Sequence, residues 1–290
     1  MTERAALLAL LQGSGKRWST VAEEVEERGS ALKVLLAGQG QLFPDVEPGG
    51  SPSVDEAEEL IQSWEQEGMH FASLLDSAYP FQLLTIHQRP PFVMWRGNQM
   101  EGDGRGVAIV GTRAASSHGI AQARELARGL AAAGVPVISG LAAGIDTAAH
   151  TGALEAGGRT VAVIGTGLRR SYPAANARLQ NEIAKEGMVL SQFLPDASPT
   201  RQSFPMRNAV MSGYASATVV IEAPWKSGAR MQARLALQHG RSVYLMRSLL
   251  EHDWAVEYAK RPGATVVDGV DDVLTSLGST ALYADSLSWA

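Results

Sequence analysis

The chain has 290 residues with a formal net charge of −5, and 45% of them are hydrophobic, as expected of a protein with a packed core. It contains no cysteine, which excludes disulfide bonds, a thiolate nucleophile and cysteine-based metal sites. The sequence shows neither an apolar run long enough to span a bilayer nor a charged-then-apolar leader. We therefore expect a soluble, cytoplasmic protein.

The charge is unevenly distributed. Residues 1–100 hold 7 Lys and Arg against 14 Asp and Glu, whereas the remaining residues hold 18 against 16. A polyanion would therefore meet the second part of the chain. An acidic, solvated helical domain explains the first part equally well.

The beginning of the chain predicts helices at 4–11, 20–28 and 31–36, and an acidic amphipathic helix over 55–68 that a glycine closes. Residues 38–53 are rich in Gly and Pro and predict a linker. The stretch Gln12-Gly13-Ser14-Gly15 faintly resembles a helix-hairpin-helix turn, although a plain interhelical loop is the favoured interpretation. We expect a small helical N-terminal domain over residues 1–75.

From about residue 105, short β-branched runs alternate with helical stretches. The runs fall at 107–110, 135–138, 160–164, 188–191, 218–221 and 242–246. Such alternation predicts a Rossmann-like α/β fold, a parallel sheet with helices on both faces and ligands at the carboxyl ends of the strands. We assign this core to residues 76–280 and a short tail to 281–290.

Three of these runs end in glycine-bearing turns that feed helices. A turn of this kind directs backbone N–H groups outward at a helix N-terminus and can bind phosphate. Because parallel strands end at one edge, we expect the turns to form a single binding face. The candidate residues of these turns are Gly111, Thr112, Gly140, Leu141, Ala142, Gly144, Gly165, Thr166 and Gly167.

Asp146 and His150 lie four residues apart and share one face of the predicted helix. They could form a general base with its orienting carboxylate, or half of a metal site. Neither a third ligand nor a nucleophile is evident, and Asp146 near a helix start is a favourable dipole partner by itself. Structural support of the turn is the favoured interpretation.

Several further motifs accompany the glycine turns. They are Tyr79-Pro80 through Pro90-Pro91, Arg96-Gly97, Gly157-Gly158, Tyr172-Pro173-Ala174-Ala175-Asn176, Phe204-Pro205-Met206-Arg207-Asn208, Ile221-Glu222-Ala223 and Ser227-Gly228. With these motifs in this order, the chain over about residues 75–275 resembles the DprA/Smf family of DNA-processing proteins.

The resemblance implies that Arg113 contributes to DNA binding, unless it is tied to a carboxylate such as Asp146. The remaining candidate contacts are basic or polar residues of the later turns, where cations can follow a phosphate chain. They are Arg169, Arg170, Asn176, Arg178, Arg207, Asn208, Lys226, Ser227 and Gly228. We expect Arg113 and Arg207 to share a surface with Arg169 or Arg170, whereas Glu222 could merely hold loops together.

The sequence departs from the family in several places. Ala174 replaces a lysine common in the family, Ser212-Gly213-Tyr214-Ala215 differs from the usual Ser-Gly-Leu-Ser, and Ala229 replaces a hydroxyl residue. The segment 246–258 replaces a Pro-Gly turn and its polar loop. It carries Met246, Leu249, Leu250, Trp254 and Val256, which predict either an exposed contact surface or a segment folded back over the sheet.

The resemblance implies a non-enzymatic protein that binds and protects single-stranded DNA and assists loading of the recombinase RecA in natural transformation and recombination. It also implies a homodimer, which we place on the late part of the core. No cofactor and no metal are expected. The alternatives are a sensor of a nucleotide-derived ligand, such as a paralogue in phage defence, and a nucleotide-cleaving phosphoribohydrolase, whose Pro-Gly-Gly-x-Gly-Thr turn has no counterpart here.

Overall fold

The computed structural model describes residues 2–39, 53–87 and 89–287. Its strands form one sheet in the order β1-β2-β6-β5-β4-β3-β7-β8-β9, parallel from β6 to β9 and antiparallel where β1 and β2 extend one edge. The strands are β1 (His70–Ser73), β2 (Phe92–Gly97), β3 (Val107–Val110), β4 (Val137–Ser139), β5 (Thr160–Ile164), β6 (Met188–Ser191), β7 (Ala217–Val220), β8 (Ser242–Met246) and β9 (Ala264–Val267).

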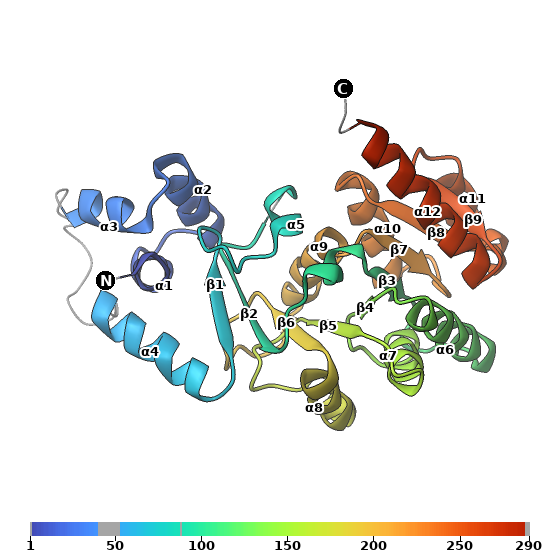
Figure 1. Ribbon diagram of the computed structural model, residues 1–290, viewed down its shortest axis with the longest axis horizontal. Helices are drawn as coiled ribbons and strands as arrows, with labels where there is room; N and C mark the ends of the chain where they lie inside the picture. The colour runs from blue at the N-terminus through green and yellow to red at the C-terminus, as the bar shows by residue number, and fades with distance from the viewer. Residues whose placement is uncertain (1, 40–52, 88, 288–290) are drawn as a thin grey trace.

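Helices cover both faces of the parallel part, as the alternating sequence pattern predicts. In Figure 1, α6, α7 and α8 lie along one face, and α9 and α10 lie along the other. The helices of the core are α5 (Phe81–Leu84), α6 (Ser117–Ala132), α7 (Ile145–Glu155), α8 (Ala177–Glu186), α9 (Ser203–Tyr214), α10 (Gly228–Gln238), α11 (Asp253–Ala259) and α12 (Val270–Leu287), with 3-10 turns η1 (Glu101–Arg105), η2 (Ala174–Asn176) and η3 (Arg247–Glu251).

The four predicted N-terminal helices are present as α1 (Glu3–Gly13), α2 (Trp18–Arg28), α3 (Ala31–Gln39) and α4 (Val54–Gln66). Ser53 and Glu56 form a capping box at the start of α4. Gly68, with φ +74°, takes the left-handed conformation expected of the glycine that closes this helix. Most of the predicted linker, residues 40–52, lies outside the described residues.

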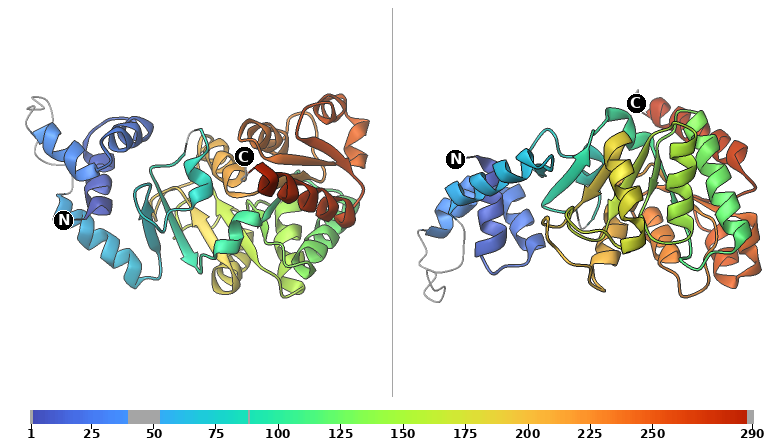
Figure 2. Two further views of the ribbon diagram at one scale, coloured as in Figure 1. Left: turned by 45° about the horizontal axis from the view of Figure 1, so that its top comes forward. Right: turned by 90° about the horizontal axis from the view of Figure 1, so that it is seen from below.

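These helices pack on one another and on the antiparallel edge of the sheet, with which they share one hydrophobic core. Trp18 contacts Phe92 of β2 with ring centroids 5.3 Å apart, and Phe92 stacks on Phe71 of β1. Figure 2 shows the helices beside this edge from two further directions. The sheet thus begins at His70, before the boundary that we predicted at residue 75.

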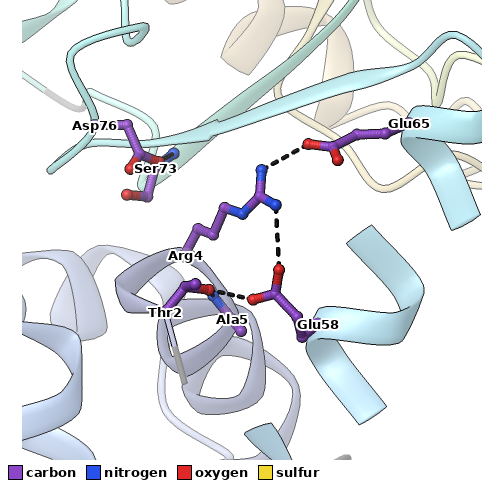
Figure 3. Close-up of polar contacts among 7 residues, drawn as sticks. All are labelled: Thr2, Arg4, Ala5, Glu58, Glu65, Ser73 and Asp76. Atoms are coloured by element: carbon purple, nitrogen blue, oxygen red, sulfur yellow. Dashed lines mark hydrogen bonds and ion pairs between the residues drawn. The ribbon is translucent and has the colours of Figure 1, made fainter. Parts of the chain in front are cut away.

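Ion pairs also hold the N-terminal helices together (Figure 3). The Arg4 guanidinium of α1 reaches Glu65 of α4 at 2.6 Å and Glu58 at 3.1 Å. The Thr2 hydroxyl donates to the same Glu58 carboxylate. Because Arg4 and Glu58 remain partly exposed, each pair contributes about 0–1 kcal/mol, and their main effect is to fix the register of α1 on α4.

Within the segment that we assigned to a short tail, 281–290, α12 continues to Leu287. Over 281–287 the two alanines and two leucines are strong helix formers, and they outweigh the single serine. None of the helices in the described ranges is both long and apolar enough to cross a bilayer.

The segment 246–258 folds back onto the core as η3 and α11. Leu249 and Trp254 are each only 2% exposed, and the Trp254 indole Nε1 donates to the Ala223 carbonyl beyond β7 at 3.1 Å. Met246 is buried as well, whereas Leu250 is half-buried and Val256 is 38% exposed. Most of the apolar residues on which we based a dimer contact therefore fold back over the sheet, as the alternative predicted, and the dimer contact itself stays a prediction.

Candidate nucleic-acid interface

The turns that follow β3, β4, β5 and β7 meet at one edge of the sheet, as predicted from parallel strand order. The turns after β3, β4 and β7, together with α9 and the first half of α10, line a cavity of about 300 Å³. A second cavity, of about 140 Å³, is formed by the turns after β4 and β5 and by Tyr172 and Pro173. Both cavities are lined by Arg113, Ala142, Phe204 and Arg207, so they form one site.

Gly144 sets the shape of the turn between β4 and α7. Its φ of +78° and ψ of −122° place it in a region that residues with a side chain avoid. A Cβ atom here would lie 2.5 Å from the Thr112 carbonyl oxygen. This glycine therefore allows the second turn to lie directly against the first, although it does not itself line either cavity.

Replacing Gly144 by alanine is expected to lower the free energy of unfolding by about 2–4 kcal/mol, because backbone strain and the clash with Thr112 add together. Urea denaturation measures this change. Gly134→Ala is the matched control, since Gly134 also has a positive φ, +73°, but no atom lies within 4 Å of the added Cβ position. Equal losses in the two variants would contradict the role of the close approach.

Leu141 and Asn176 belong to the support of the site rather than to its surface. Leu141 is a buried residue with φ +59°, and its carbonyl accepts a hydrogen bond from Asn176 Nδ2 at 2.9 Å. The same amide nitrogen donates to Thr147 Oγ1 at 2.9 Å. Asn176 thus ties the turn after β4 to the start of α8, and our assignment of both residues to ligand contact is not supported by their placement.

Arg207 lies beneath the site and is only 6% exposed. Its Nη1 donates to the carbonyls of Gly140 and, at 3.0 Å, Val163, and its Nε donates to Asn208 Oδ1 at 3.0 Å. Asn208 is buried too, and its Nδ2 donates to the Gly228 carbonyl at 3.3 Å. The pair thus links the ends of β4 and β5 to α10, and it lines the cavity from below.

Asp146 is a buried carboxyl group close to Arg207. Burial raises the pKa of Asp146, while the opposite charge of Arg207 and the Ala142 N–H, 3.3 Å from Oδ2, act to lower it. Burial also lowers the pKa of Arg207, although a guanidinium remains charged at neutral pH. The two residues therefore form a buried, partly compensated pair in the floor of the site.

His150 does not form a catalytic dyad with Asp146. Its ring is fully buried, and its Nδ1 lies 2.7 Å from Thr160 Oγ1, away from the cavities. Burial lowers its pKa to about 3, so the imidazole is neutral at physiological pH. Among the described residues, no group of three His, Asp or Glu side chains could hold a metal ion.

A cation and two aromatic rings stand at the mouth of the site. The Arg113 guanidinium lies 5.0 Å from the centroid of the Phe204 ring, and Phe204 lies 5.4 Å from the Tyr172 ring. Arg113 and Tyr172 are exposed. Arg113 forms no ion pair with Asp146 or with any other carboxylate of the described chain, so its charge is available to a ligand. Aromatic faces of this kind can stack nucleobases.

The loop between β7 and α10 provides the opposite wall. Lys226 is exposed and lines the larger cavity, whereas the Ser227 hydroxyl caps α10 by accepting from the Ala229 N–H at 3.1 Å. Glu222 accepts hydrogen bonds from the Ser116 N–H and hydroxyl, at 3.1 and 2.7 Å. Glu222 therefore holds this loop against the start of α6, which confirms the structural interpretation.

The structure brings most of the predicted candidates together. Those that line one or both cavities are Gly111, Thr112, Arg113, Gly140, Ala142, Gly165, Thr166, Arg207, Asn208, Lys226, Ser227 and Gly228. Those that line neither are Leu141, Gly144, Gly167, Arg169, Arg170, Asn176 and Arg178. Gly167 is excluded because it packs against the carbonyls of Leu194 and Pro195.

Arg169 and Arg170 do not line these cavities, although we predicted that one of them would share a surface with Arg113 and Arg207. Arg169 is held by Glu67, which ends α4, and by Asp196, 2.6 Å away. Arg170 Nε donates to the Asp196 carbonyl at 3.3 Å. Arg178 lies on α8 and lines a separate hollow beside Gly157. Carboxylates that are distant in the sequence thus neutralise Arg169, which composition alone could not indicate.

Phe204 and Tyr172 were quoted within motifs but were not among the predicted contact residues. In each motif an aromatic residue precedes a proline, and this was the sequence signal that could have indicated them. Asp146, which was interpreted as structural, also lines the larger cavity.

The fold and these motifs agree with the comparison to known proteins. The model of the family described as DNA recombination-mediator protein A matches residues 70–278. The chain belongs to this family. It is 39% identical to DNA processing protein DprA of Streptococcus pneumoniae over 70% of this chain and 72% of that protein. It is 36% identical to Protein Smf of Synechocystis over 77% of this chain, but spans only 58% of that relative's length.

Two solved structures of proteins named DprA share the fold. The crystal structure of DprA from Streptococcus pneumoniae matches 94% of this chain and 93% of its own, with a TM-score of 0.69 and 29% identity. A structure of DprA from Helicobacter pylori, described as showing a single-stranded DNA binding mode, matches 72% of this chain and 96% of its own, with a TM-score of 0.64 and 26% identity. The predicted resemblance to DprA/Smf proteins is thereby confirmed.

Proposed function

We propose that this chain binds single-stranded DNA at the two cavities and acts as a DNA-processing protein without cleaving the strand. The observation that carries the proposal is the row of Arg113, Phe204 and Tyr172 at the mouth of the site. Arg113 can bind a phosphate while the rings stack unpaired bases. The Helicobacter pylori relative, whose structure concerns binding of single-stranded DNA, supports this choice of ligand.

A single strand suits this site better than a duplex. Its faces are formed by turns and aromatic rings, and the bases of a duplex do not expose their flat faces to such rings. Contacts to phosphate and stacking carry little base information, so binding is expected to tolerate any sequence.

Fluorescence anisotropy with a labelled oligonucleotide tests the proposal. Affinity should fall steeply with salt, with a slope of about −0.7 in log–log form for each phosphate contacted. Unlabelled single strands should compete far better than the same mass of duplex. Equal competition by duplex, or binding that salt does not change, would reject it.

A sensor of a nucleotide-derived ligand is the second candidate. The volume of the larger cavity, about 300 Å³, lies at the lower end of small-molecule sites and favours this alternative. The same assay separates the two functions, because a mononucleotide at equal phosphate concentration should displace the oligonucleotide only if the sensor function is correct.

The family membership extends the proposal to recombination. On this basis the chain acts as a homodimer that assists loading of the recombinase RecA onto the bound strand during DNA uptake. Light scattering over a concentration series tests the dimer. ATP hydrolysis by RecA on strands covered with single-strand-binding protein should rise when this chain is added, and an unchanged rate would reject a loading role.

A further inference from the structure

A third cavity lies beside the site, on the far side of the loop that follows β7. It has a volume of about 400 Å³ and shares Lys226, Ser227 and Gly228 with the larger cavity of the site. Its other lining residues are Trp225, Arg230, Met231, Arg234 and Tyr258. A ligand that leaves the site past Lys226 therefore enters this cavity directly.

All of the charged side chains that line this third cavity are cationic. Lys226, Arg230 and Arg234 contribute three positive charges, and no carboxylate lines the cavity. None of the three forms an ion pair with a carboxylate in the described ranges. Cationic side chains that are not engaged in salt bridges can bind an external anion without first breaking one.

Trp225 presents an accessible aromatic face in the same place. The residue is 58% exposed, and the Arg230 guanidinium lies over its ring at 3.8 Å from the centroid. Arg230 Nη1 also donates to the Trp225 carbonyl at 3.3 Å, which fixes the guanidinium against the indole. A large exposed ring that a neighbouring side chain holds on one face is suited to stacking with a base. Little of its conformational freedom remains to be lost on binding.

The neighbouring helix α11 borders the third cavity and adds no cation to its lining. Tyr258 is 4% exposed and lies under the Arg261 guanidinium at 4.0 Å, so its ring supports the cavity rather than binding a base. Glu257 on the same helix forms an ion pair with Lys260 at 2.8 Å. Asp253 and Glu257 of α11 and the following Lys260 and Arg261 carry equal numbers of opposite charges, and the cations that line the cavity lie on the loop and α10.

We propose that this cavity, which we call the Trp225 subsite, binds the continuation of the DNA strand held in the main site. One base stacks on Trp225, and Arg230 and Arg234 contact the adjacent phosphates. The inference rests on the proposed binding of single-stranded DNA and adds its path, from Arg113 across Lys226 to α10.

The test compares oligothymidylates of two lengths, about 4 and about 15 nucleotides, within the range that one single-strand-binding domain covers. Trp225→Ala should weaken binding of the long strand about five- to one-hundred-fold, because base–aromatic stacking is lost. It should leave the short strand, which fits the main site alone, unchanged. Trp225→Phe keeps an aromatic face and should recover part of the affinity.

Two further measurements make the assignment specific. Arg234→Ala should reduce the salt slope for the long strand by about 0.7, the value for one phosphate contact. Arg128→Ala is the matched control, since Arg128 is an exposed helical arginine on α6 that pairs with Glu155 at 2.7 Å. Tryptophan fluorescence should be quenched by the long strand in the wild type, and that quenching should be lost in Trp225→Phe.

The outcomes separate this inference from the proposed function. If the wild type binds both strands but Trp225→Ala binds the long strand equally well, the Trp225 subsite is overturned and the main site stands. If the wild type binds neither strand, both are overturned. If Trp225→Ala weakens the short strand as much as the long one, Trp225 belongs to the main site and a separate subsite is rejected.

Discussion

Replacing Arg113 by alanine is expected to weaken binding of single-stranded DNA by about 10- to 150-fold. A hydrogen bond between a charged group and its partner contributes about 1.5–3 kcal/mol, and 1.4 kcal/mol corresponds to a factor of ten. Arg113 is exposed, lacks an ion pair within the described chain and rests on Phe204, so the change removes a contact without uncovering a buried charge. Anisotropy at fixed salt gives the affinity of each variant.

Controls distinguish this effect from a general loss of positive charge. Arg178→Ala removes the same charge from α8, away from the site, and should change the affinity less than twofold at moderate salt. Arg113→Lys keeps the charge but loses the planar fork, so its affinity should lie between alanine and wild type. An Arg178→Ala loss as large as that of Arg113→Ala would show that overall charge, and not this site, dominates binding.

The parallel part of the fold could be predicted because its signal is local. Each of the six predicted strands appears within a few residues of its expected place, since a short β-branched run between helices leaves few alternatives. β1, β2 and β9 were not predicted. β1 and β2 precede the region where strands and helices alternate, and β2 joins the parallel part only through antiparallel pairing with β6, which is distant in the sequence. β9 is an edge strand in which three of the four residues are exposed or half-buried, so its sequence carries a weak strand signal.

The candidate site could be predicted to the level of its turns but not of its charges. The predicted strand order places Gly111, Gly140 and Gly165 at one edge of the sheet, and they lie at that edge in the structure. Whether an arginine is available to a ligand depends on which carboxylate lies near it. Arg169 pairs with Glu67, which precedes it by 102 positions, and no local sequence pattern predicts such a pair.

Arg207 shows a second limit of sequence interpretation. Its position after Phe-Pro-Met indicated a contact for an external anion, yet its guanidinium is directed mainly to backbone carbonyls of the turns. A motif fixes the element on which a side chain lies. Burial, which depends on the packing of α9 against the sheet, then decides whether the charge faces a ligand or the interior.

Arg207→Met is expected to lower the free energy of unfolding by about 3–5 kcal/mol at neutral pH. Methionine fills a similar volume, but it leaves Asp146 as a buried carboxylate without its compensating charge. The carbonyls of Gly140 and Val163 also lose their donor. Urea denaturation of the variant and the wild type under identical conditions measures the difference.

The pH dependence of the free energy of unfolding tests whether Asp146 causes this loss. A carboxyl whose pKa is raised in the folded chain stabilises folding at low pH, and this contribution is lost as the pH rises through the folded-state value. Removing Arg207 takes away a charge that lowers the pKa of Asp146. Arg207→Met should therefore lose stability over a wider range of pH above the ordinary carboxyl value than the wild type does.

The double variant Arg207→Met/Asp146→Asn completes the cycle. Because asparagine carries no charge, it should recover a large part of the stability at neutral pH and remove the added pH dependence, while a loss from the missing hydrogen bonds remains. If the double variant is as unstable as Arg207→Met and equally sensitive to pH, Asp146 is not the residue that Arg207 compensates. The floor of the site would then be held by the bonds from Arg207 to the strand ends alone.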